Sequence, residues 1–188
     1  MLARQDPEQL LDNAVNALSA GTECRSMLDK LPVPIYTTDE TGAVTYWNSA
    51  CVDFAGREPE LGHDRWCVTW KLYTTTGEPL AHDKCPMAQA IRQRRPVREA
   101  IAIAERPDGS RVAFKPYPTP LFDEQGRFTG AVNMLIDVTE EQSDALHGQA
   151  DHCRRLALAM YDRQTSKILG EMAEGLDRTA DELTSKRD

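Results

Sequence analysis

Two residues of this sequence with chemistry suited to a metal or cofactor lie close together. Cys85 directly precedes Pro86, and His82 stands three residues before the cysteine. A proline after a cysteine restricts the loop and leaves the sulfur accessible, as in some thiolate-ligated haem sites. Cys85 or His82 is therefore a candidate haem ligand. The same two residues are a weaker candidate for half of a zinc site than for a haem ligand, because the second pair of ligands that tetrahedral zinc requires is missing.

The cysteines as a set do not predict a metal or disulfide framework. There are five, an odd number, without any Cys-x-x-Cys pair. They are Cys24, Cys51, Cys67, Cys85 and Cys153. Disulfide-rich domains use even numbers of cysteines, and zinc ribbons use closely spaced pairs. We therefore expect reduced thiols, most of them buried as small apolar side chains.

Composition excludes several classes of protein. Of 188 residues, 40% are hydrophobic and 28% are charged, which is typical of a soluble globular chain. No run approaches the ~20 consecutive apolar residues of a membrane span. The first ten residues lack the apolar core of a signal peptide, so we expect a cytoplasmic protein. A net charge of −8 leaves no basic surface for a nucleic-acid backbone.

The aromatic residues divide the chain into three parts. Eleven of the twelve lie between Tyr36 and Phe128, which places the packed core within residues 31–139. Residues 1–30 are then an N-terminal helical cap, and residues 140–188 are a C-terminal helical extension. We expect one domain with helices on both sides of it in the sequence.

The central part combines strands with short helices. Its β-like runs are joined by turns that contain Gly42, Gly109 and Gly126, and short helical runs occupy residues 48–54 and 86–95. The order of strands, short helices and strands predicts an α+β domain, in which helices cover one face of an antiparallel sheet.

The two flanking regions carry helix signals with apolar faces. Asp6 as an N-cap and Pro7 at the first helical position begin a helix that Gly21 would end. Its apolar face consists of Leu11, Val15 and Leu18. In the extension, apolar residues recur every three or four positions over residues 169–183. Neither face has an evident partner within the chain, so we expect a homodimer formed through the terminal helices.

Several short motifs follow one another in a characteristic order. They are Pro34-Ile35-Tyr36-Thr37-Thr38-Asp39, Tyr46-Trp47-Asn48-Ser49-Ala50, Cys85-Pro86-Met87-Ala88, Asp108-Gly109-Ser110 and Asp137-Val138-Thr139-Glu140. In this order, the chain from about residue 31 to residue 140 resembles a PAS domain, of the kind found in small stand-alone bacterial proteins. In PAS-like sequences, a Cys-Pro-Met at this position commonly packs in the core, which gives Cys85 a purely structural alternative.

The resemblance implies a five-stranded antiparallel sheet, short helices on one face, and a ligand cavity between them. By the alternation of a strand, Ala131, Asn133 and Leu135 share one face. Asn133 would then be the polar group of an apolar cavity. The candidate pocket residues are Trp66, Trp70, Met87, Ile91, Phe114, Asn133 and Leu135. The alternative is a filled core in which Asn133 satisfies a backbone group.

The resemblance also implies how a signal would leave the domain. Asp137, Val138 and Thr139 stand where the last strand passes into the following helix, and we expect them to relay a change from the pocket to that helix. The recipient would be another protein, such as a kinase or a regulator.

Enzymatic activity is not expected. His147 and His152 lie on the helix where a PAS-linked histidine kinase carries its phosphate acceptor, but the surrounding Glu/Asp-x-Arg-x-Pro pattern and a glycine-rich phosphate loop are missing. Cys67 lacks the Asn-Cys-Arg-Phe-Leu surroundings of a flavin photoreceptor. Three hypotheses remain, and the first of them requires no cofactor. They are a sensory module, a haem-based redox or gas sensor using Cys85 or His82, and an adaptor with a filled core. Whether the protein binds a cofactor is unknown.

Overall fold

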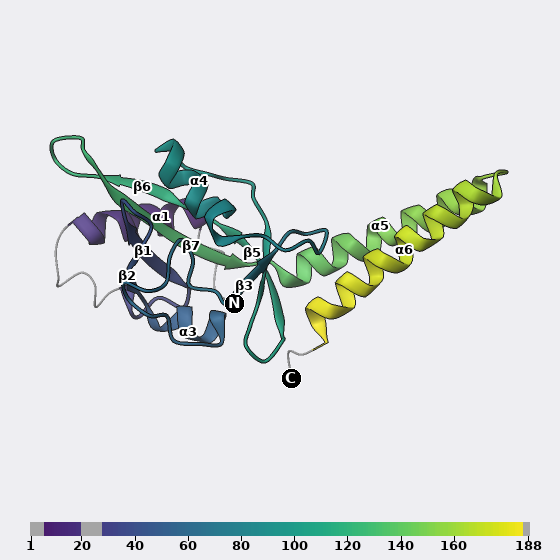
Figure 1. Cartoon of the computed structure of the whole chain (residues 1–188), viewed down its shortest axis with the longest axis horizontal. Helices are drawn as coiled ribbons and strands as arrows, with labels where there is room; N and C mark the ends of the chain where they lie inside the picture. The colour runs from purple at the N-terminus through teal and green to yellow at the C-terminus, as the bar shows by residue number, and fades with distance from the viewer. Residues whose placement is uncertain (1–5, 20–27, 186–188) are drawn as a thin grey trace.

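The structure is a computed structural model that describes residues 6–19 and 28–185. A sheet with short helices forms one end of the molecule, and two long helices project from it as a hairpin (Figure 1). None of the helices in the described ranges combines the length and apolar composition that a bilayer span needs.

The sheet is antiparallel throughout, which confirms the predicted α+β class. Its strands are β1 (Ile35–Asp39), β2 (Val44–Trp47), β3 (Lys71–Tyr73), β4 (Ala102–Glu105), β5 (Arg111–Pro116), β6 (Thr119–Phe122) and β7 (Phe128–Asp137). They lie in the order β2-β1-β7-β5-β4-β3, and β6 pairs with β7. Seven strands replace the five expected: β3 has only three residues, and β6 resumes the pairing with β7 after a break.

The break between β5 and β6 has a chemical cause. Pro116 and Pro118 flank Tyr117 and have no backbone N–H to donate to a ladder. The Tyr117 N–H still bonds to the Met134 carbonyl at 2.9 Å. The chain therefore stays beside β7 across the break, so both halves position residues against the same long strand.

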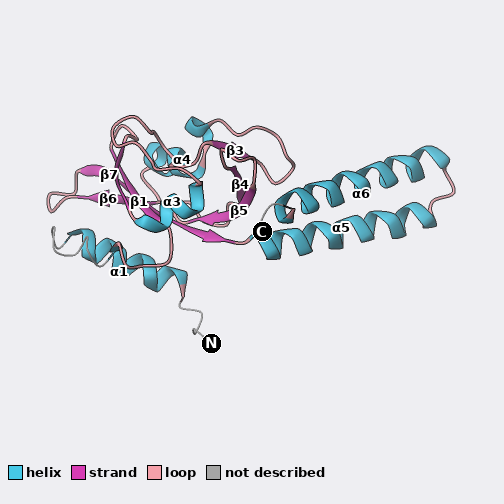
Figure 2. Ribbon diagram, turned by 90° about the horizontal axis from the view of Figure 1, so that it is seen from below, coloured by secondary structure: helices cyan, strands magenta, loops and turns pink. Residues whose placement is uncertain are grey.

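Both faces of the sheet are covered, by different elements (Figure 2). The helices α3 (Ser49–Ala55), η1 (His82–Lys84) and α4 (Pro86–Gln93) lie on one face, and α1 (Pro7–Ser19) packs on the other. The alternation predicted for β7 decides which residue faces which side. Ala131 and Leu135 belong to the core under α3 and α4, whereas Val132 and Met134 belong to the core under α1.

The expectation that the N-terminal helix lacks cover within the chain is wrong. Leu11 is 1% exposed because it packs with Val132 and Met134 of β7. Asp6 caps the helix, accepting the Glu8 N–H at 3.1 Å. Gly21 and the side chain of Leu18 lie outside the described residues.

The C-terminal extension folds into an antiparallel hairpin of α5 (Thr139–Ala159) and α6 (Arg163–Thr184). Asp162 caps α6 by accepting the Thr165 N–H at 2.8 Å. Part of the apolar stripe of α6 therefore does have a partner in the chain, contrary to expectation, whereas Met172 of the stripe stays 52% exposed. Ala173 and Ala180 are buried, as is Ala150 of α5, and such small side chains let two helices approach closely.

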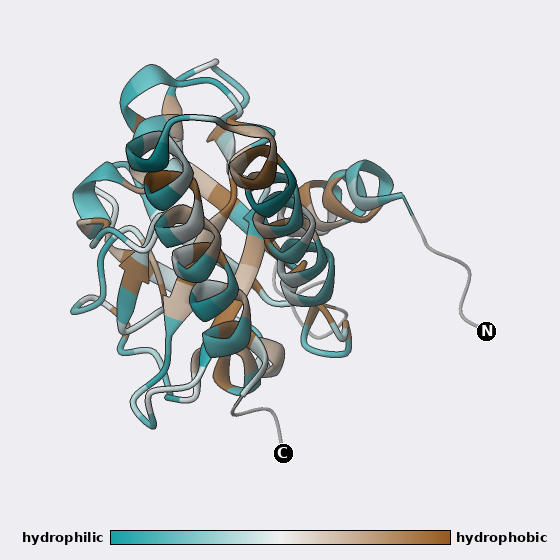
Figure 3. Ribbon diagram, turned by 90° about the vertical axis from the view of Figure 1, so that its right-hand side faces the viewer, coloured by the Kyte–Doolittle hydropathy of each residue, from teal (hydrophilic) through white to brown (hydrophobic). Residues whose placement is uncertain are grey.

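The base of the hairpin packs on the sheet. Leu146 of α5 and Ala180 and Leu183 of α6 form one buried cluster with Ile103 of β4 and Ala113 of β5. Figure 3 looks along the hairpin, whose helices lie side by side in front of apolar strands. The extension is thus joined to the sheet at the first turns of α5 and the last turns of α6.

Candidate functional site

Tyr36 of β1 connects the sheet to the loop that precedes β3. It is fully buried, and its hydroxyl donates to the Trp66 carbonyl at 2.9 Å. The same hydroxyl accepts from Asn133 Nδ2 of β7 at 3.0 Å. Burial raises the pKa of this phenol well above its usual value, so the group stays protonated. Tyr36 is therefore a neutral bridge between a loop and the central strand.

Asn133 completes the bridge on the sheet side. It is 2% exposed, and its Oδ1 accepts the Tyr117 N–H at 2.9 Å. Both ends of its amide thus have partners within the chain, one of them in the interrupted region between β5 and β6. The resulting chain of hydrogen bonds runs from Trp66 through Tyr36 and Asn133 to Tyr117.

The structure brings most of the proposed pocket residues together. Met87, Ile91, Phe114 and Leu135 belong to one buried cluster, and Trp66 packs against its edge. Trp70 lies outside this buried cluster, with 45% of its surface exposed. The space between sheet and helices is occupied by the side chains of this cluster, including Tyr36.

The proposed relay residues form a tight junction where β7 ends. Thr139 is buried, and its hydroxyl donates to Asp137 Oδ1 at 2.6 Å while accepting the Ala113 N–H at 3.1 Å. The Val138 N–H donates to the Ala113 carbonyl at 2.9 Å. The first turn of α5 is therefore fixed directly to β5.

A comparison with protein families decides the classification. The family described as the PAS fold matches residues 28–143, more than half of the chain. The chain belongs to the PAS family. The match covers the sheet, the short helices and the junction at Thr139, and it identifies no catalytic domain.

Several solved structures resemble this chain at low sequence identity. A PAS domain from Colwellia psychrerythraea is 16% identical with a TM-score of 0.45, covering 63% of this chain and 96% of that one. An RNA-binding Light-Oxygen-Voltage receptor is 20% identical with a TM-score of 0.50, covering 81% of this chain and 41% of the receptor. VqmA of Vibrio cholera, in a complex with ligand and DNA, is 17% identical with a TM-score of 0.50, covering 87% of this chain and 80% of VqmA. Among curated proteins, none matches the chain.

The PAS core contains three buried thiols, which the sequence did not place together. Cys51, Cys67 and Cys85 all belong to the cluster that surrounds Tyr36. Burial raises the pKa of Cys51 and of Cys85 to about 12. Cys85 is therefore a thiol at neutral pH, and at 2% exposure it packs within the core, which is consistent with its structural alternative.

The other candidate haem ligand, His82, lies on the outer side of the PAS core. It lines a hollow together with Trp66, Trp70 and Arg57. Burial lowers the pKa of His82, against a smaller opposing effect of Asp64, and the imidazole is neutral at pH 7. Among the described residues, no group of three or more histidine, cysteine or acidic side chains could hold a metal ion.

Tyr36 is the residue of this hydrogen-bonded bridge that the pocket prediction did not include. It stands in β1, where Ile35, Tyr36, Thr37 and Thr38 are all buried, so the strand offers no alternation from which one face could be selected. The only sequence signal is a tyrosine within an otherwise apolar or uncharged run, because a buried phenol needs a hydrogen-bond partner.

Proposed function

We propose that this PAS protein is a sensory module that transmits a change in its core through the α5–α6 hairpin, pairs with a second copy, and signals to another protein such as a kinase or regulator. The PAS family supports a role in signalling. The transmission route and the dimer are inferences from the geometry of the hairpin.

One observation carries the transmission step: the start of α5 and the end of α6 are both attached to β5. The first turn of α5 is bound to β5 through Thr139 and Ala113. The last turns of α6 return to β4 and β5 through Leu183 and Ala180. A shift of β7 or β5 would therefore change the seating of both helices at once, and the change would be largest at the distal tip.

One side of the hairpin is suited to pairing because it carries almost no charge. A groove of about 720 Å³ runs between α5 and α6. It is lined by Thr75, Thr76, Gln142, Ala145, Leu146, Gly148, Gln149, His152, Cys153, Met172, Gly175, Leu176 and Thr179. Among these described residues none is aspartate, glutamate, lysine or arginine, although 28% of the chain is charged. Charge depletion of this kind is typical of the centre of an interface.

The other side of the hairpin is occupied by ion pairs. Asp177 of α6 bonds to Arg154 of α5 and to His147 Nδ1, the latter at 3.1 Å. Arg154 also pairs with Asp151 at 2.9 Å. These charged side chains already have partners within one chain, so a second copy that approached this side would form few new ion pairs.

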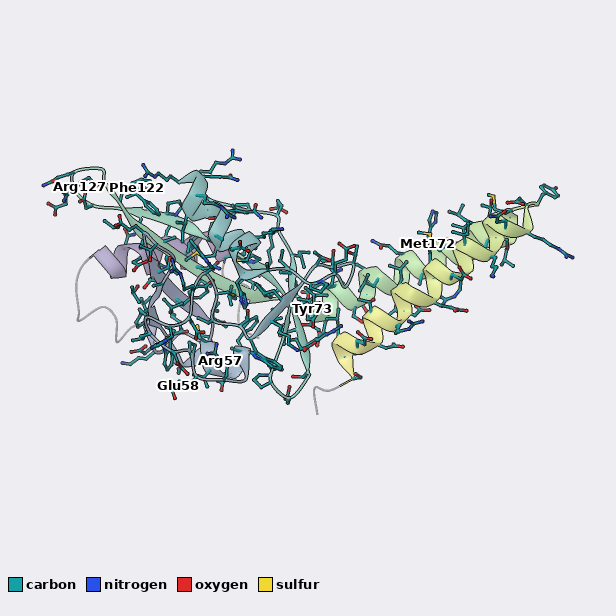
Figure 4. All side chains as sticks on the ribbon, viewed as in Figure 1. Arg57, Glu58, Tyr73, Phe122, Arg127 and Met172 are labelled. Atoms are coloured by element: carbon teal, nitrogen blue, oxygen red, sulfur yellow. The ribbon has the colours of Figure 1, made fainter. Side chains whose placement is uncertain are left out.

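A second copy fits the uncharged side best. Each chain carries a net charge of −8, so two copies repel each other unless they meet where acidic side chains are missing. Met172 projects from this side with 52% of its surface exposed (Figure 4). Gly148 and Gly175 leave open space beside it, since an added methyl group would contact nothing within 4 Å. A two-fold axis would place each Met172 in the partner's open space, as in a four-helix bundle.

Light scattering after size exclusion tests the dimer. We expect a particle of twice the 21.0 kDa chain mass. Met172→Glu should weaken association by at least about tenfold, because it places a charge at the centre of the interface. Leu158→Glu is the matched control: Leu158 is 88% exposed and does not line the groove, so its variant should remain dimeric. A monomeric wild-type chain, or equal effects of the two substitutions, would refute this interface.

One observation also favours the adaptor hypothesis as a second candidate. Tyr36 is wholly buried, and both ends of the Asn133 amide are hydrogen-bonded within the chain. The polar groups between the sheet and the helices therefore have their partners without a ligand. In an adaptor, the hairpin would hold a partner without any ligand in the core. The partner's affinity would then be unaffected by small molecules, which a binding assay with and without ligand distinguishes.

A further inference from the structure

We propose that the hollow lined by Arg57, Trp66, Trp70 and His82 binds a small aromatic carboxylate, and that this binding is the input of the module. The binding site stands on its own, and its role as an input rests on the proposed function. Buried side chains of the chain itself pack the interior of the PAS core, whereas this hollow opens on its outer side.

The hollow has the size and composition of a small-molecule site. Its volume is about 390 Å³, within the range of about 300–1,000 Å³ usual for ligand pockets. It is lined by Arg57, His63, Asp64, Arg65, Trp66, Cys67, Thr69, Trp70 and His82. Arg57, which lies beside α3 (Figure 4), marks its position on the molecule.

Arg57 provides a fixed positive group. Its guanidinium donates to the Val68 carbonyl at 3.2 Å and to Asp64 Oδ2 at 2.8 Å. Asp64 is itself held by the Glu60 N–H at 2.8 Å. A guanidinium has five N–H donors, and these two bonds leave others for a ligand. Planar, rigidly held donors of this kind match the geometry of a carboxylate.

The balance of charge in the hollow favours an anion. Arg57 and Arg65 contribute two positive charges, whereas Asp64 contributes a single negative one. This is a local positive excess in a chain whose net charge is −8. A single carboxylate would neutralise it, which is why we infer a monocarboxylate in preference to a more highly charged ligand.

His82 contributes one ring nitrogen without a well-formed hydrogen bond, although its imidazole also interacts with the Thr69 backbone. Its Nε2 is buried and has no partner. A buried polar atom without a partner is uncommon in folded proteins and requires an explanation. The imidazole is neutral, so this nitrogen can bond to a ligand oxygen that carries a proton, or donate to a carboxylate in the other tautomer.

Two indole rings give the hollow its preference for an aromatic ligand. Trp70 is 45% exposed, an unusual position for so large an apolar side chain. Trp66 has a positive φ of 67°, which a tryptophan adopts only under constraint. That conformation places its ring against Gly42, where even one added carbon would lie 2.3 Å from the indole. The loop is therefore built to hold an indole at the edge of the hollow.

Trp66 also connects the hollow to the sheet. Its carbonyl accepts the Tyr36 hydroxyl, which in turn accepts from Asn133 on β7. A ligand that displaces Trp66 would alter these hydrogen bonds, and β7 leads directly to Thr139. The input and the hairpin are thus joined by a continuous set of contacts.

Calorimetry with the full chain tests the site, using 2-naphthoate as the probe and 2-naphthamide as its uncharged counterpart. We expect 2-naphthoate to bind at least about tenfold more tightly than the amide, because only the carboxylate neutralises the hollow. Trp70→Leu and His82→Phe should each lower the affinity for 2-naphthoate by at least about fivefold. Phe122→Leu is the matched control, since Phe122 is an exposed aromatic residue at the other end of the PAS core, and it should bind like the wild type (Figure 4).

The outcomes separate this site from the proposed function. Absence of 2-naphthoate binding, equal binding of the amide, or binding that survives both Trp70→Leu and His82→Phe would refute the site, whatever the oligomeric state. Binding should also shift the amide resonance of Thr139, and Tyr36→Phe should abolish that shift while leaving affinity largely intact. Binding without any shift at Thr139 would support the site but refute its role as an input.

Discussion

At the scale of single residues, the PAS core depends on polar groups that are buried but paired. Tyr36, Asn133 and the Trp66 carbonyl lie in an apolar cluster, where each would be unfavourable alone. Together they satisfy one another and fix the loop before β3 onto β7. Such a network specifies one arrangement of the core, because any displacement leaves a buried group without a partner.

We predict that Tyr36→Phe destabilises the protein by about 1–3 kcal/mol, because the Asn133 amide and the Trp66 carbonyl both lose a buried partner. The free energy of unfolding is measured by urea titration. Tyr161→Phe is the control with the same chemical change at a fully exposed position. Equal stability of the two variants would show that the bridge contributes nothing.

At the scale of elements, the pairing of β1 with β7 requires a glycine. Gly130 has φ of +146° and lies opposite Asp39 in the ladder. An added Cβ would lie 2.0 Å from the Thr38 carbonyl oxygen, which is part of the backbone and cannot rotate away. The two strands can approach each other here only because no side chain stands between them.

Gly130→Ala should therefore lower the free energy of unfolding by about 2–4 kcal/mol, through backbone strain and overpacking. Gly126→Ala separates the two effects. Gly126 also has a positive φ, +74°, but open space around it, so its variant should lose only about 1 kcal/mol. Thermal or urea denaturation distinguishes them, and a smaller loss at Gly130 than at Gly126 would contradict the steric argument.

At the scale of the whole molecule, the hairpin and the PAS core share an apolar joint. Leu183, near the end of α6, is 1% exposed because it packs with Ile103 and Ala113 of the sheet. Arg111 of β5 adds ion pairs to Glu105 and Glu182, at 3.1 and 2.6 Å. These pairs are partly exposed and contribute little, so the apolar contacts account for most of the attachment.

We expect Leu183→Ala to reduce stability by about 2–4 kcal/mol, the usual cost of a cavity at a buried leucine. Leu158→Ala, at the exposed tip, should change it by about 0.5 kcal/mol or less. Helix content by circular dichroism and tryptophan fluorescence of the core should be followed together. Coincident transitions in the wild type would show that hairpin and core unfold as one unit, and separate transitions would show that the joint is weak.

Features that depend on neighbouring residues could be predicted from the sequence alone. Asp6 and Asp162 cap helices through atoms two or three residues away, and both follow from local chemistry. The alternation of β7 correctly separated Ala131 and Leu135 from the residues of the other face, because successive side chains of a strand point in opposite directions. The ordered motifs sufficed to predict the α+β class and the PAS family.

Which residues those faces contact could be read from the folded chain alone. Leu11 is covered by β7, and Ala173, Ala180 and Leu183 of the α6 stripe are buried within the chain, whereas Met172 of the same stripe stays exposed. Trp66 and Trp70 are alike in sequence, yet one packs on the core and the other is exposed. Tyr36 and Asn133 bond across 97 residues. Local patterns encode periodicity and capping, whereas contacts between distant segments depend on how the elements pack in space.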